Sequence, residues 1–140
     1  MKILMVEDDE SNRLLTYLEL REEKNWDIIT ASNGQEAMIL FEKEHPDIVT
    51  LDIKLPDIEG SKLLREMKKK RPDMPVIILT GYDKHPDVSE ADAYIVKTLS
   101  CGEELKKHIK NLLPAGSGSS LFAGQARSAD SGKFSKKRKG

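Results

Sequence analysis

Three acidic residues stand where apolar stretches of the sequence end. Glu7 and Asp8 follow the run Lys2–Val6, and Asp52 closes the run Ile48–Asp52. If both runs are parallel strands of an open α/β sheet, their carboxyl ends meet at the edge where ligands bind. Carboxylates that converge there repel one another and raise their own pKa values. A hard divalent cation relieves that repulsion, and a set of ligands made only of oxygens favours Mg²⁺.

A lysine and a threonine close two further apolar runs. Lys97 ends the run Ala93–Lys97 and Thr80 ends the run Pro75–Thr80, so both should reach the same edge of the sheet. A metal ion, an ammonium group and a hydroxyl around one point neutralise a phosphoryl group from several sides. Asp52 lies centrally among these groups. We therefore predict that its carboxylate is a nucleophile that forms an aspartyl-phosphate.

These side chains need a sheet that brings the strand ends together. Short apolar runs alternate with helical patterns, which favours a parallel sheet covered on both faces, because right-handed crossovers bury each helix against it. We predict a doubly wound, flavodoxin-like α/β fold with five strands in the order 2-1-3-4-5. The predicted strands are Lys2–Val6, Asp27–Ala31, Ile48–Asp52, Pro75–Thr80 and Ala93–Lys97.

Helical periodicity fills most of the intervals between the strands. Helices are expected over about Ser11–Glu23, from Asn33 to just before Pro46, over about Ser61–Lys70, and after Ser100. The spacing of an acid three residues after Asn33 and after Ser100 resembles a capping box. The apolar stripes predicted for these helices are Leu14, Leu15 and Leu18; Ala37, Leu40 and Phe41; Leu63, Leu64 and Met67; and Leu105, Ile109, Leu112 and Leu113.

Composition limits the class of protein to which the chain can belong. The charged fraction of 34% and the absence of a long apolar run exclude a membrane span. The short apolar run after Met1 and Lys2 lacks the features of a signal peptide. The single cysteine, Cys101, excludes an internal disulfide and fits a reducing cytoplasm.

Charge and composition both change near residue 114. Residues 1–113 hold 17 basic and 23 acidic residues, whereas residues 114–140 hold six basic and one acidic residue. The stretch Pro114–Ser120 has the content of a flexible linker, and the remainder has few large apolar residues. We predict a domain at 1–113 and a flexible basic tail at 114–140, either disordered or an artificial terminus. The alternative is that Lys136–Lys139 contacts nucleic acid or an anionic surface.

Four short motifs, each at a predicted strand end, resemble the receiver domains of two-component response regulators. They are Val6-Glu7-Asp8-Asp9, Leu51-Asp52 with Leu55-Pro56 and Gly60, Leu79-Thr80-Gly81, and Tyr94-Ile95-Val96-Lys97. Each motif alone is weak, but all four in this order are a strong signal. The resemblance covers about 113 residues and is nearest in layout to the single-domain chemotaxis type.

The resemblance implies a role for each matching residue. Asp8 and Asp52 would bind Mg²⁺ directly, Glu7 through a water molecule, and Lys54 through its backbone carbonyl. Asp52 would be phosphorylated, with Lys97 paired to the phosphoryl group. Thr80 would then turn toward the phosphoryl group, and the rotamer of Tyr94 would follow.

The implied protein is a signalling switch that catalyses only its own phosphorylation and dephosphorylation. Its implied partners are a histidine kinase or histidine phosphotransfer protein and a downstream protein target. We expect no insertion into a membrane and no binding to nucleic acid, and we expect a cytoplasmic location.

Two features depart from the family pattern. Thr98 follows Lys97 where many receivers have a proline after a cis bond. Because a cis bond between two other residues costs roughly 3 kcal/mol, we expect trans geometry. Only 16 residues separate Thr80 from Lys97, which leaves room for a short or irregular fourth helix at about Pro86–Ala91. The partner surface of the family could therefore change while the chemistry survives.

Alternative functions meet specific objections. Phosphatases of the haloacid-dehalogenase type also use an aspartate nucleophile at a strand end, but they need a second acid two residues later, where this chain has Lys54. A dinucleotide-binding fold would need a glycine-rich turn after the first strand. A receiver-like module that binds partners without phosphorylation would not need the full set of site residues.

Structural roles are the alternative for single residues. Glu7 and Asp8 could cap a helix, Thr80 could be an ordinary strand residue, and Tyr94 could belong to the core or its rim. We assign no site to the basic run Lys68–Arg71, to the three histidines or to Cys101.

Overall fold

The computed structural model describes residues 1–81, 89–97 and 102–113. Residues Lys2–His108 form one compact unit that contains the sheet and all the predicted site residues, while Met1 and Ile109–Gly140 belong to a second unit. The predicted boundary between a domain at 1–113 and a tail at 114–140 stays a prediction, because the tail lies outside the described residues.

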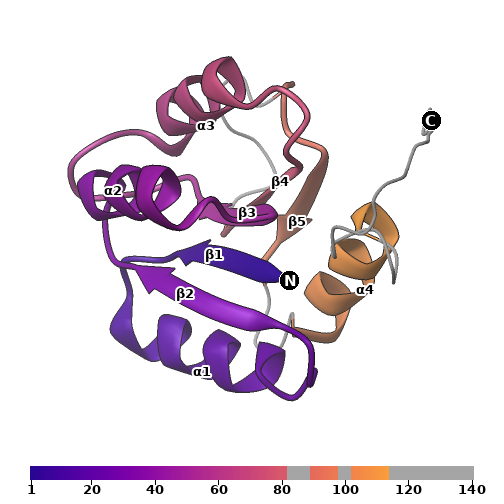
Figure 1. The fold of residues 1–140 in the computed structure, drawn as a ribbon. Helices are drawn as coiled ribbons and strands as arrows, with labels where there is room; N and C mark the ends of the chain where they lie inside the picture. Colours follow the sequence, from indigo (N-terminus) through magenta and orange to yellow (C-terminus); the bar gives the residue numbers. More distant parts are fainter. Residues whose placement is uncertain (82–88, 98–101, 114–140) are drawn as a thin grey trace. The chain divides into compact units, whose positions relative to one another are not determined.

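A parallel sheet of five strands forms the centre of the first unit (Figure 1). Its strands lie in the order β2-β1-β3-β4-β5, and every neighbouring pair is parallel. The predicted fold and strand order are therefore confirmed. The strands are β1 (Lys2–Val6), β2 (Asp27–Ala31), β3 (Ile48–Asp52), β4 (Val76–Thr80) and β5 (Ala93–Val96).

Helices cover both faces of this sheet. In the described part of the chain they are α1 (Glu10–Leu20), α2 (Gly34–Glu44), α3 (Gly60–Lys70) and α4 (Gly102–Leu112). Figure 1 shows α2 and α3 together on one side and α1 on the other. The first half of α4 lies beside the end of α1, since Lys106 forms an ion pair at 2.8 Å with Glu22, two residues after α1 ends.

The two central strands are buried along their whole length. All five residues of β3 and of β4 are buried, as expected for strands covered on both faces. On the side of α2 and α3, aliphatic side chains of the sheet pack against buried residues of both helices. These helix residues include Ala37, Phe41, Leu63, Leu64 and Met67, which confirms most of the two predicted apolar stripes.

The prediction for the first helix needs correction. Leu14, Leu15 and Leu18 share one face as predicted, but they are 45–57% exposed. The side that faces inward consists of Arg13, Thr16, Tyr17 and Leu20, spaced one helical turn apart. Of the residues in α1, only Leu20 is buried. The leucine stripe therefore does not contribute to the core and is available at the surface.

Two predictions fall on residues that the structure does not describe. The bond between Lys97 and Thr98 lies outside the described residues, as does the first half of the predicted short helix at 86–91, namely residues 86–88. Ser89 and Glu90, which are described, form a turn.

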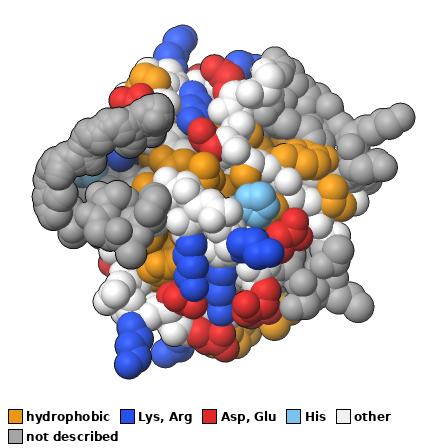
Figure 2. All heavy atoms as spheres, turned by 90° about the vertical axis from the view of Figure 1, so that its right-hand side faces the viewer, with side chains coloured by type: hydrophobic (Ala, Val, Ile, Leu, Met, Phe, Trp, Pro, Cys, Tyr) orange, Lys and Arg blue, Asp and Glu red, His pale blue; other side chains and the backbone are white. Residues whose placement is uncertain are grey.

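Charges of both signs are interspersed on the face shown in Figure 2. Lysine and arginine side chains lie there among aspartate and glutamate side chains. The described part of this face presents no uniform field to a charged partner.

One buried polar group in the core has no partner among the described residues. Thr50, at the centre of β3, is 0% exposed, and its hydroxyl accepts and donates no hydrogen bond. Replacing Thr50 with valine keeps the shape and removes the desolvated hydroxyl. We expect a gain of about 1 kcal/mol in the free energy of unfolding, measured by urea denaturation. As a control, valine at the half-buried Thr30 of β2 should change stability by less than about 0.5 kcal/mol.

Candidate functional site

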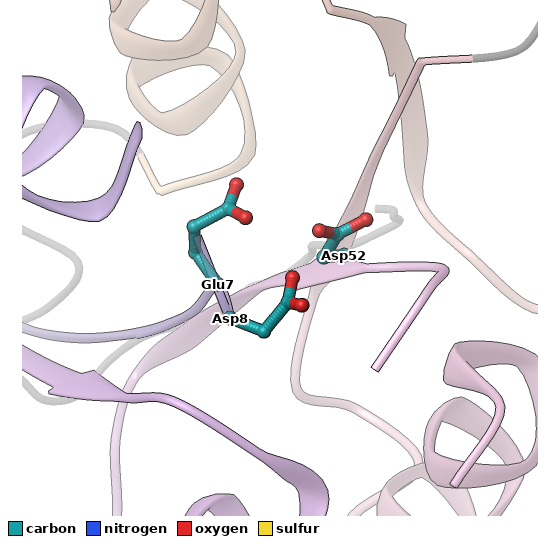
Figure 3. Close-up of side chains that lie close together, drawn as sticks. All are labelled: Glu7, Asp8 and Asp52. Carbon is teal, nitrogen blue, oxygen red and sulfur yellow. The ribbon is translucent and has the colours of Figure 1, made fainter. Parts of the chain in front are cut away.

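Three carboxylates converge at the carboxyl edge of the sheet. β1 and β3 are neighbours with Val6 opposite Leu51. The residues that follow these two along the chain, Glu7 and Asp52, therefore lie beside each other at the edge of the sheet. Glu7, Asp8 and Asp52 each place one carboxylate oxygen within 4.8 Å of the others (Figure 3). Glu7 and Asp52 are both buried, whereas Asp8 is exposed. The predicted cluster is present, with one side open to solvent.

Lys97 joins this cluster from the end of β5. Its backbone nitrogen donates a hydrogen bond to the Thr80 carbonyl at 2.6 Å, which fixes the residue just beyond the strand. Its Nζ atom lies 2.5 Å from Oε1 of Glu7 and 3.1 Å from Oδ2 of Asp52. The lysine therefore bridges the two buried carboxylates, and the pairing with Glu7 was not predicted from the sequence.

Burial and charge act in opposite directions on this pair. Burial raises the pKa of Glu7, and the hydrogen bond and charge of Lys97 oppose this rise only in part. Burial lowers the pKa of Lys97, but the hydrogen bonds and charges of Glu7 and Asp52 together outweigh this effect, so the pKa of Lys97 is above its ordinary value. The single ammonium group of Lys97 thus pairs with two buried carboxylates, and the exposed carboxylate of Asp8 adds a third negative charge to the cluster. The excess of negative charge favours an additional cation.

The turn after β1 is held by a residue that the sequence analysis did not single out. Arg13 donates through one guanidinium nitrogen to the carbonyl of Glu7 at 2.9 Å and to that of Asp8 at 3.4 Å. Asp9 caps α1 by accepting from the backbone nitrogen of Asn12 at 2.8 Å. A basic residue one turn into the helix after an acidic run is the only sequence signal for this contact.

Backbone contacts also shape the loop after β3. Asp52 accepts a hydrogen bond from the Lys54 backbone nitrogen at 3.2 Å, through the oxygen that does not bind Lys97. The Gly60 nitrogen donates to the carbonyl of Ile53 at 2.7 Å. A side chain at Gly60 would lie 2.4 Å from the Asp52 carbonyl oxygen, so only glycine allows this approach. The predicted role of the Lys54 carbonyl in metal binding stays a prediction.

The two predicted switch residues occupy neighbouring strands. Thr80, at the end of β4, is buried. Tyr94 in β5 is half-buried and packs against the hydrophobic core, with Ile78 as its partner in the ladder. This position suits the core or rim role considered above as well as a switch role.

Residues 3–110 match the family described as the response regulator receiver domain. The chain belongs to this family. Its receiver fold is thereby accounted for.

Solved receiver structures resemble this receiver domain closely. TrrA from Thermotoga maritima, solved in complex with Mg²⁺-BeF, is 40% identical with a TM-score of 0.74, and the match covers 80% of this chain and 98% of TrrA. TrrA has also been solved in complex with the histidine kinase ThkA; that match has a TM-score of 0.72 at 40% identity and covers 80% of this chain and 97% of TrrA.

Curated relatives of this receiver are longer proteins. The transcriptional regulatory protein TrcR of Mycobacterium tuberculosis is 36% identical over 118 residues, which are 81% of this chain and 45% of TrcR. The chain spans about half the length of the curated relatives it matches. Among the described helices of the receiver, none has the length and apolar character required to cross a membrane.

Proposed function

We propose that this receiver accepts a phosphoryl group on Asp52 in a reaction that depends on Mg²⁺, and that the phosphorylated form changes its binding to a downstream protein. The observation that carries the proposal is the convergence of Glu7, Asp8, Asp52 and Lys97 at one sheet edge. The family and the relative solved with Mg²⁺-BeF support it.

The donor set fits a magnesium ion. The grouped ligand atoms are all carboxylate oxygens, and the exposure of Asp8 leaves room for the water molecules that Mg²⁺ retains. Asp8 and Asp52 would hold the ion directly, with Glu7 acting through a water molecule and the Lys54 carbonyl completing the protein ligands. When bound, the ion neutralises charge on the phosphoryl oxygens.

The protein's own groups prepare Asp52 for the transfer. A phosphohistidine of the partner would donate the phosphoryl group: an Asp52 oxygen bonds to phosphorus as the phosphorus–nitrogen bond breaks, and the imidazole keeps the electron pair. Lys54 and Lys97 each hold one oxygen of Asp52, which fixes the carboxylate orientation. Lys97 would then donate its hydrogen bonds to the new phosphoryl oxygens. The Thr80 hydroxyl would donate a hydrogen bond to a further phosphoryl oxygen.

The proposed donor is a histidine kinase or a histidine phosphotransfer protein. A relative solved in complex with its kinase supports this partner class. The exposed leucines of α1 offer an apolar docking surface on the helix that begins directly after Asp9. We further propose that the chain acts as a cytoplasmic switch that catalyses only its own phosphorylation and dephosphorylation, with Thr80 and Tyr94 carrying the change to a partner surface.

Acetyl phosphate tests this proposal without the unknown kinase. In the presence of Mg²⁺, intact-mass measurement should show one added phosphoryl group, and chelation of the metal with EDTA should prevent the addition. The physical reason is that three carboxylates repel an anionic donor unless a cation screens them. Phosphorylation at an unchanged rate in EDTA would contradict the magnesium requirement.

A further inference from the structure

Asp57, an exposed residue in the loop between β3 and α3, binds the beginning of a helix far from it in sequence. One carboxylate oxygen accepts a hydrogen bond from the backbone nitrogen of Gly34 at 2.8 Å, and the other accepts one from Gln35 at 2.9 Å. The bond from Gly34, followed by that from Gln35, lowers the pKa of Asp57 below its ordinary value. The side chain is therefore a charged clamp between this loop and α2.

The residue after Asp57 adds a second attachment at the same place. Ile58 is partly buried and packs against the hydrophobic core. A side chain at Gly34 would lie 2.1 Å from Cγ2 of Ile58 and 3.2 Å from a carboxylate oxygen of Asp57. The close approach of loop and helix thus requires glycine at the first position of α2.

Capping of α2 does not by itself account for the clamp. Asn33, the residue that precedes α2, already caps the helix by accepting a hydrogen bond from the Glu36 nitrogen at 2.8 Å. Asp57 takes two further nitrogens of the first turn, those of Gly34 and Gln35, which water ordinarily serves at an exposed helix end. What Asp57 adds is a fixed position for its own loop.

The other end of this loop carries the candidate metal site. The loop leaves β3 at Asp52 and is closed at its base by the bond from Gly60 to Ile53 and by an isolated antiparallel bridge between Lys54 and Glu59. Lys54 also donates its backbone nitrogen to the Asp52 carboxylate. The Lys54 backbone that holds one oxygen of Asp52 is therefore three residues from the loop tip that Asp57 attaches to α2.

We propose that Asp57 is a positioning residue for the metal site: it fastens the loop after β3 to α2 and so sets the Lys54 backbone and the Asp52 carboxylate for Mg²⁺. This inference rests on the proposed function, because it assumes that Mg²⁺ binds at these residues. Groups that orient metal ligands from outside typically contribute 10- to 100-fold to metal affinity, so the clamp should be measurable.

The experiment compares two variants that weaken the same helix end. Asp57→Ala removes the clamp, whereas Asn33→Ala removes the ordinary cap of α2 and leaves the loop attached. Titration calorimetry with MgCl₂ should show about tenfold weaker binding for Asp57→Ala and a change of less than about twofold for Asn33→Ala. Asp57→Asn, which keeps one acceptor oxygen, should fall between Asp57→Ala and the wild type. The Gly60 amide should exchange with solvent faster in Asp57→Ala only.

The outcomes separate this inference from the proposed function. Wild-type affinity for Mg²⁺ in Asp57→Ala, or an equal loss in both alanine variants, would overturn the positioning role and leave the proposed function standing. If the wild-type protein binds no Mg²⁺, the proposed function fails and the positioning role fails with it.

Discussion

The Asp52→Asn variant is expected to take up no phosphoryl group from acetyl phosphate in the presence of Mg²⁺. The amide keeps the size of the carboxylate but is not a nucleophile at neutral pH, and the neighbouring acids cannot replace it. Glu7 is held by Lys97, and Asp8 is exposed at the rim of the cluster. Intact-mass spectrometry after incubation would show the wild-type protein gaining one phosphoryl group and the variant gaining none.

A matched substitution checks that the loss is specific to position 52. Asp73 lies exposed in the turn between α3 and β4, so Asp73→Asn removes an equal charge far from the cluster. This variant should be phosphorylated at the wild-type rate. Phosphorylation of Asp52→Asn at that same rate would show that another residue is the acceptor.

Replacement of Lys97 by methionine should strongly destabilise the metal-free protein. The substitution leaves the carboxylates of Glu7 and Asp52, with side chains only 9% and 10% exposed, without their shared cation. Removing one partner of a buried ion pair typically costs about 3 kcal/mol or more. Urea denaturation in EDTA should show this loss, and saturating Mg²⁺ should recover more stability in Lys97→Met than it adds to the wild-type protein, because the ion supplies the missing positive charge.

The pH dependence of this loss has a definite sign. Without Lys97, burial and mutual repulsion raise the pKa of Glu7 further above its value in the unfolded chain. A carboxyl group whose pKa is raised by folding destabilises the native state increasingly as pH rises through the folded value. The loss of stability in Lys97→Met should therefore be larger at neutral pH than at about pH 5.

An exposed ion pair provides the control for this prediction. Lys70 pairs with Glu42 at 2.6 Å, but the two side chains are 48% and 55% exposed. Lys70→Met should leave the free energy of unfolding nearly unchanged at either pH, because solvent screens an exposed ion pair. Equal effects at positions 70 and 97 would mean that burial of the carboxylates does not control the stability of the site.

Short-range sequence patterns predicted the strands and the residues that end them. Runs such as Ile48–Asp52 are apolar at nearly every position, because both faces of a central parallel strand are covered. A carboxylate at the end of such an apolar run indicates a site residue at the end of the strand. Parallel pairing then brings every such residue to one edge, so the convergence of Asp8, Asp52 and Lys97 followed from topology alone.

The amphipathic pattern of the first helix was misleading for a physical reason. Periodicity shows that Leu14, Leu15 and Leu18 share a face, but it does not show which face the sheet will cover. In the folded chain, Arg13 faces inward because its guanidinium group binds the carbonyls after β1. Its contacts orient the helix, and the leucines come to lie at the surface.

The sequence by itself determined the order of the strands and the identity of the acids, the threonine and the lysine at their ends, since these depend on local composition and on the rules of parallel sheets. Only the tertiary structure decided that Lys97 also binds Glu7, and that Asp57 fastens its loop to α2 across 22 residues of sequence. Such contacts join groups whose spacing along the chain carries no periodic signal. They arise from the distances between elements after packing.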